Sequence, residues 1–142
     1  MLAAACHKDR SVHVTSESFS TIAEKRAALQ KYVTLEHPSD TLDFVIDMAD
    51  PRTAKAGEPP HCDVRLHATI READAEAWKH GMTRVQDAPD AGWVTAVPHA
   101  PPATGFTWYH EASSPERGVL GLSENKTDVL YRLRCYPPTP GS

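Results

Sequence analysis

Two stretches of alternating apolar and polar side chains constrain the fold of this chain more than any other feature. Residues 42–48 and 62–70 each place an apolar side chain at every second position. Successive side chains of a β-strand point to opposite faces of a sheet, so this period of two is typical of a strand with one face in the core. The proline-rich stretch between them, residues 50–60, favours a loop. We therefore expect two antiparallel strands, each with its other face open to solvent.

Two further segments have the pattern of helices. Thr21 is placed to cap the first helix, with Glu24 three residues later as in a capping box. Its apolar residues recur at helical spacing, and a nearby proline makes Val33 the expected end. The second helix is expected over residues 72–82, where good helix formers surround an apolar line and Gly81 is suited to end the helix.

The remaining strands complete the expected order β-α-β-β-α-β-β-β. Short polar turns separate the last strands, which favours a meander. These further strands are expected over residues 11–15, 106–110, 119–122 and 129–136. The element order predicts an α+β fold, with an antiparallel β-sheet and two main helices packed on one face.

Length and composition fit one globular domain. The chain has 142 residues, of which 40% are hydrophobic and 24% charged, as in ordinary globular proteins. We expect a signal-like segment and linker over residues 1–10, a single α+β domain over 11–136 and a flexible tail over 137–142. A formal net charge of −4 argues against nucleic acid as a partner. No apolar run reaches about 18 residues, so no membrane span is expected.

Motifs for catalysis, cofactors or metals are missing from the sequence. His61, Asp63, Arg65 and His67 share the outward face of the strand over residues 62–70. Since His61 and His67 would lie about 20 Å apart on that strand, they cannot bind one metal ion together. The chain has no Gly-x-Ser-x-Gly elbow, no glycine-rich phosphate loop and no dinucleotide fingerprint. The sequence therefore predicts a protein that is not an enzyme and that needs neither cofactor nor metal.

Two short segments carry residues that are typical of binding surfaces. Trp108 and Tyr109 are adjacent on a strand, so one is expected in the core and the other on the open face of the sheet. A compact polar turn follows near residue 124 and is suited to insertion into a partner's cleft. The simpler interpretations are that one of the two aromatics belongs to the core, that the other is an ordinary surface residue, and that the turn is a plain hairpin loop. The candidate contact residues are Tyr109, Glu111, Ser123, Glu124, Asn125 and Lys126.

The first six residues, Met-Leu-Ala-Ala-Ala-Cys, are followed at once by a polar run that begins with His7. Small apolar residues that end at Cys6 resemble the lipobox of bacterial lipoproteins. In that family the cysteine is modified with a lipid and the segment before it is removed. The resemblance implies export and a lipid anchor on Cys6, without a membrane span. It also implies a periplasmic location, with the outer membrane favoured because residue 7 is not Asp.

Export would place Cys62 and Cys135 in an oxidising compartment, where disulfides persist. A bridge between them would close a loop of about 70 residues and stabilise the fold by about 4 kcal/mol in the chain-entropy model. The alternative is that both are small buried hydrophobic residues. The sequence leaves these two possibilities open.

Together, the lipobox-like start, the acidic α+β domain and the missing catalytic set resemble small periplasmic lipoproteins of Gram-negative bacteria. Among these are immunity proteins against type VI-secreted toxins that degrade peptidoglycan. The resemblance implies an inhibitor whose turn at residues 123–126 blocks the toxin's substrate groove, while its negative charge speeds capture of a basic toxin. The alternatives are an envelope lipoprotein with a maintenance role, and a small-ligand binder with a pocket near Trp93 or Trp108.

Overall fold

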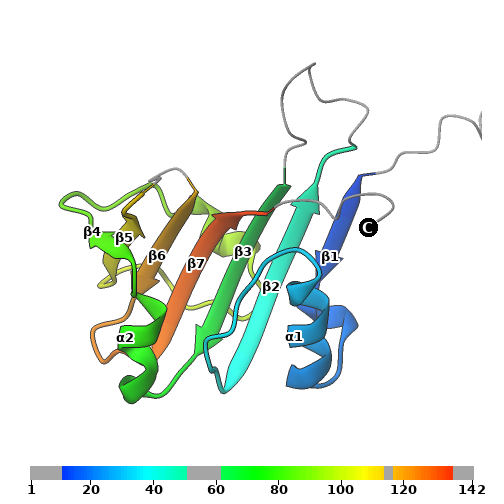
Figure 1. The fold of residues 1–142 in the computed structure, drawn as a ribbon, viewed down its shortest axis with the longest axis horizontal. Coiled ribbons are helices and arrows are strands. Elements are labelled where there is room, and N and C mark those ends of the chain that lie inside the picture. The colour runs from blue at the N-terminus through cyan, green and yellow to red at the C-terminus, as the bar shows by residue number, and fades with distance from the viewer. Residues whose placement is uncertain (1–10, 51–61, 114–116, 136–142) are drawn as a thin grey trace, which may run out of the picture.

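The computed structural model describes residues 11–50, 62–113 and 117–135. Within these residues, seven strands form one antiparallel sheet that is accompanied by two short α-helices (Figure 1). The strands are β1 (Val12–Thr15), β2 (Thr41–Met48), β3 (Cys62–Thr69), β4 (Met82–Arg84), β5 (Thr107–Glu111), β6 (Gly118–Leu122) and β7 (Asp128–Arg134). The helices are α1 (Ile22–Gln30) and α2 (Ala75–Trp78), with the 3-10 turns η2 (Ser16–Ser18), η4 (Glu72–Asp74) and η5 (Gly92–Ala96).

The last strand, β7, lies in the middle of the sheet. The strand order is β1-β2-β3-β7-β6-β5-β4, so β7 pairs with β6 on one side and with β3 on the other. The expected pairing of β2 with β3 and the expected late meander are both confirmed. The β3–β7 pairing joins residues that are about half the chain apart, and no local pattern indicates it.

The inward residues of β2 and β3 form the main core, as their alternation predicts. Phe44, Ile46, Val64 and Leu66 are completely inaccessible to solvent. The same apolar cluster contains Ala28 and Leu29 of α1, Ala75 and Trp78 of α2, and Leu120, Val129 and Tyr131 from β6 and β7. One continuous core therefore connects both helices to the central strands.

The other face of the sheet is covered in part, so the expectation that this whole face is open to solvent was wrong. Val94 of η5 packs with Trp108 and Leu130 in a second buried cluster, and η5 also contacts β3. Asp63 and His67, which we expected to be solvated, are each only 6% exposed. The cover comes from the proline- and alanine-rich chain before β5, whose sequence has little periodicity to predict its position.

The start of α1 follows its sequence signal. The Thr21 side-chain oxygen accepts a hydrogen bond from the backbone N–H of Glu24 at 3.1 Å, so the predicted N-cap is confirmed. The helix ends at Gln30, three residues before the expected end at Val33. There the backbone N–H of Val33 still bonds to the carbonyl of Leu29, but the chain has left helical geometry.

The second predicted helix is much shorter than residues 72–82. It consists of η4 and α2, and it ends at Trp78. Met82, expected at the end of the helix, instead begins β4 and pairs with Glu111 of β5. Gly81, with a φ of +78°, makes the reversal between helix and strand, because glycine adopts this left-handed conformation without steric cost. Strand pairing has overridden the local helix preference here.

A disulfide joins Cys62 and Cys135 at one end of the two central strands. Cys62 begins β3 and Cys135 directly follows β7, with 5.1 Å between their Cα atoms. The backbone N–H of Cys135 also donates to the carbonyl of Cys62 at 3.1 Å. Both residues are buried, and the structure has them bridged rather than as separate thiols.

Candidate functional site

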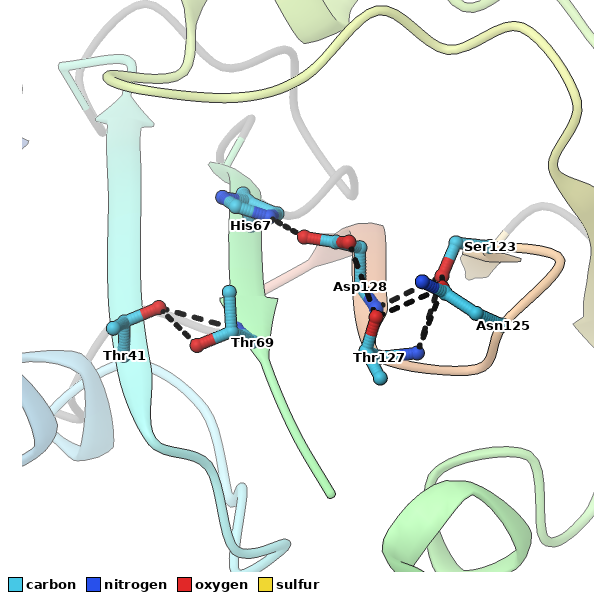
Figure 2. A network of polar contacts seen from close by, with 7 residues as sticks. All are labelled: Thr41, His67, Thr69, Ser123, Asn125, Thr127 and Asp128. Carbon is cyan, nitrogen blue, oxygen red and sulfur yellow. Dashed lines mark hydrogen bonds and ion pairs between the residues drawn. The ribbon is translucent and has the colours of Figure 1, made fainter. Parts of the chain in front are cut away.

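The turn between β6 and β7 is held in shape by its own polar side chains (Figure 2). The Oγ of Ser123 accepts the backbone N–H groups of Thr127 at 3.2 Å and of Asp128 at 2.9 Å. The same hydroxyl donates to Oδ1 of Asn125 at 2.8 Å, and the Thr127 hydroxyl donates to this oxygen at the same distance. The backbone N–H of Lys126 closes the turn on the carbonyl of Ser123 at 2.9 Å. We call residues 123–127 the binding turn.

The tip of the binding turn presents charged side chains on a fixed backbone. Glu124, Asn125 and Lys126 are all exposed. Lys126 has a φ of +61°, in the left-handed region that non-glycine residues rarely adopt. Such a conformation persists only where surrounding contacts hold it, and the bonds of Ser123 and Asn125 supply those contacts. The backbone that carries the exposed Glu124 side chain is therefore fixed by contacts within the turn.

A hollow of about 550 Å³ lies beside the binding turn. Gly105 and Phe106 line one side of it, and Glu124, Asn125 and Asp128 line the other. The Phe106 ring packs on Trp108, with 6.2 Å between the ring centroids. Two carboxylates next to an aromatic ring suit a basic side chain with an apolar stem.

The base of the binding turn is attached to the central strand β3. Asp128, which follows the turn, has its Oδ1 2.8 Å from Nε2 of His67 (Figure 2). The carbonyl of Thr127 accepts the backbone N–H of Ile70 at 2.8 Å. Sequence reasoning did not include His67 in the site, because it placed this residue on a solvated face. The β3–β7 register, in which Thr69 pairs with Asp128, would have identified it, but that register depends on long-range pairing.

The structure does not bring Tyr109 and Glu111 together with the binding turn. Thr107, at the start of β5, pairs with Leu122 directly before the turn. Glu111 lies four residues further along β5, about 13 Å from that pair at the usual rise of a strand. Tyr109 is half-buried against the main core, and the Lys79 ammonium lies 5.7 Å from its ring centroid. The six expected contact residues therefore separate into two groups.

Trp108 is the aromatic residue of β5 that lies in the core, as expected for one of the pair, whereas Tyr109 is half-buried and not on an open face. Trp108 is 5% exposed, and Trp93 packs edge-on against it at 6.2 Å between centroids. Gly121 lies under the indole, where a Cβ would come within 2.8 Å of the ring. The indole therefore occupies space that only glycine leaves free, and Trp108 belongs to the second core cluster.

The pKa of Tyr131 gives a pH-dependent prediction for the end of the sheet that carries Glu111. Burial, and secondarily the charge of Glu111, raises the pKa of Tyr131 to about 12. Because a tyrosine in an unfolded chain ionises near pH 10, the unfolded state loses this proton first as the pH rises. The stability contributed by neutral Tyr131 is thus complete below about pH 10 and lost between about pH 10 and 12.

An ultraviolet absorbance titration of tyrosinate checks this prediction. The folded protein should show a tyrosine ionisation step near pH 12, and a Tyr131→Phe variant should lack that late step. Glu111→Gln should lower the late pKa only slightly, because burial is the larger cause. Absence of the late step from the folded wild-type protein, or its persistence in Tyr131→Phe, would contradict the assignment.

A ladder of ion pairs crosses the sheet on the face that η5 covers in part. Nδ1 of His13 lies 2.5 Å from the Asp47 carboxylate, which also pairs with Arg65. The Asp63 carboxylate forms an ion pair with Arg65, whose Nε lies 3.4 Å away, and it accepts a hydrogen bond from Nε of Arg132 at 3.1 Å. Each carboxylate faces two cationic or ionisable partners, so the ladder compensates its own charges and links four strands.

In the described ranges, no group of three or more His, Cys, Asp and Glu side chains is arranged to hold a metal ion. None of the helices in this part of the chain is both long and apolar enough to cross a membrane. Cys6, the expected lipidation site, lies outside the described residues. Comparisons with protein-family models, curated proteins and solved structures found no match to this chain.

Proposed function

We propose that this protein is an exported immunity protein that binds a secreted peptidoglycan-degrading toxin and blocks its substrate groove. The observation that carries the proposal is the exposed Glu124 carboxylate on a turn whose backbone is already fixed by Ser123 and Asn125. A turn that is rigid before binding loses little conformational entropy on association. The carboxylate would accept hydrogen bonds from toxin groups that otherwise hold the glycan or peptide.

The surroundings of the turn support a protein partner. The hollow beside it adds Phe106 and Asp128 to the contact surface, next to Glu124. The net charge of −4 favours rapid capture of a basic partner. The proposal includes the predicted packing of both helices on one face of the sheet, which the shared apolar cluster supports.

The disulfide supports the exported location. Bridges such as Cys62–Cys135 are common in the periplasm and rare in the reducing cytosol. We propose a lipid on Cys6 as the membrane anchor, with the protein in the periplasm and the outer membrane favoured. In this proposal the membrane is contacted only through the lipid, and neither a cofactor nor a nucleic acid takes part.

Substitution of Glu124 tests the proposal. We expect Glu124→Arg to weaken inhibition of the toxin on the order of 100-fold, because loss and reversal of one charge in a buried pair costs about 2–5 kcal/mol. Glu124→Ala should weaken it less. The measurement is inhibition of peptidoglycan hydrolysis by the toxin expected from a neighbouring gene. Glu17→Arg is the matched control, since Glu17 is exposed on η2 and the net charge changes equally.

The outcomes separate the candidate functions. Unchanged inhibition by both Glu124 variants would remove the binding turn from the interface. Failure of the wild-type protein to bind the toxin would instead favour an envelope lipoprotein with a maintenance role. Saturable binding of small apolar molecules at Trp93 or Trp108 would favour the ligand-binding alternative.

A further inference from the structure

His67 is a buried histidine whose side chain is hydrogen-bonded to Asp128, the residue that directly follows the binding turn. Its side chain, on the central strand β3, is 7% exposed, and its Nε2 lies 2.8 Å from Oδ1 of Asp128 (Figure 2). Asp128 is the first residue of β7. Its backbone N–H donates to the Ser123 hydroxyl at 2.9 Å, and its carbonyl accepts the N–H of Ser123 at 3.0 Å. A continuous set of hydrogen bonds thus runs from β3 to the turn.

The surroundings of the imidazole fix the position of its proton. Nδ1 is buried, and among the described residues it has no hydrogen-bond partner. A proton on Nδ1 would leave a buried N–H without an acceptor and would place the Nε2 lone pair against the Asp128 carboxylate. A proton on Nε2 avoids both penalties and donates a charge-assisted hydrogen bond to Asp128. Nε2 of His67 therefore acts as a donor that is directed at this carboxylate.

We propose that His67 is a positioning residue for the binding turn. By holding the Asp128 carboxylate, it fixes the first residue of β7, and through Ser123 it keeps the turn in the shape that presents Glu124. The role of this shape in toxin binding rests on the proposed function, whereas the effect of His67 on the turn does not. A purely structural histidine would change the stability of the whole fold without a selective effect on residues 123–127.

The first test measures backbone motion in the free protein by ¹⁵N relaxation. His67→Leu keeps an apolar side chain in the buried site but removes the donor. We expect the order parameters of residues 124–127 to fall from about 0.85 to below about 0.6 in this variant. His67→Gln should keep them near the wild-type values, because its amide nitrogen lies as far along the side chain as Nε2 and also donates.

The matched control is Ser16→Ala, which removes another buried polar contact away from the turn. Ser16 is completely buried, and its Oγ accepts the backbone N–H of Phe44 at 3.0 Å and donates to Asp43 at 3.4 Å. This variant should destabilise the fold but leave the turn rigid.

Asp128→Ala removes the hydrogen bond between His67 and Asp128 by taking away its acceptor. This second variant keeps the test decisive if His67→Leu does not fold.

The second test measures inhibition of the toxin by the same proteins. We expect His67→Leu to weaken inhibition on the order of ten-fold, with recovery in His67→Gln, because a mobile turn must be ordered on binding. Turn motion in His67→Leu equal to that in Ser16→Ala would overturn the proposal. If the turn loosens but inhibition depends on neither His67 nor Glu124, the binding turn is removed from the toxin interface while the positioning of the turn by His67 stands. Absence of inhibition by the wild-type protein would overturn the inhibitor function and leave the result on turn motion unaffected.

Discussion

Loss of the Cys62–Cys135 disulfide is expected to lower the free energy of unfolding by about 4 kcal/mol. The bridge joins residues that are 73 positions apart, and the closed loop contains every strand from β3 to β7. Without the bridge, the unfolded chain gains the conformational freedom of this whole loop, and the unfolded state is favoured. Since domains of this size are stable by about 5–15 kcal/mol, a large part of the stability would be lost.

Denaturant unfolding of three samples checks this expectation: the oxidised protein, the reduced protein, and the double variant Cys62→Ala/Cys135→Ala. Reduction keeps both buried side chains in place and so isolates the contribution of the bridge. The double variant should resemble the reduced protein and should not respond to reductant. Equal midpoints for the oxidised and reduced proteins would contradict the expected contribution.

Trp78→Ala is expected to destabilise the fold by about 3–5 kcal/mol, the range for removal of a large aromatic side chain from a core. Trp78 is 1% exposed in the main cluster, at the end of α2. Its indole N–H donates to the carbonyl of Pro38 at 3.0 Å, and the His37 ring packs 5.1 Å from its own ring. One side chain thus attaches α2 to the segment that leads into β2.

Two controls separate packing from hydrogen bonding at this position. Trp78→Phe keeps most of the apolar contact but leaves the Pro38 carbonyl without its donor, so its effect should be smaller than that of alanine. Trp93→Ala removes a half-buried indole from the second cluster and should also cost less. A Trp78→Ala effect no larger than that of Trp93→Ala would contradict the assigned role.

The pKa of His37 gives an independent readout of the same substitution. Burial lowers the pKa of His37 below its ordinary value, against an opposing effect of Glu36 and with a smaller lowering effect of His80. Removal of the neighbouring indole would admit water, so Trp78→Ala should raise the His37 pKa towards its ordinary value. A histidine titration by NMR at temperatures where the variant remains folded would measure this change.

The candidate site was only partly predictable. The turn at residues 123–126 could be located because polar turn residues separate two apolar segments, and the structure places it between β6 and β7. Tyr109 and Glu111 were included as candidate contacts because their segment carries aromatic residues typical of binding surfaces, but four residues of extended chain separate Glu111 from the pair beside the turn. His67 was missed, since its contact with Asp128 requires β7 to pair with β3.

By itself, the sequence determined those features that depend on neighbouring residues. The alternation of β2 and β3, the Thr21 cap and the turns of the late meander all arise from preferences within a few positions. Only the tertiary structure decided that β7 enters the centre of the sheet, that η5 covers part of the second face and that β4 replaces the end of a helix. These outcomes depend on how much apolar surface distant segments bury together. The favourable free energy of this burial comes from residues far apart in the chain, so no short stretch of sequence contains it.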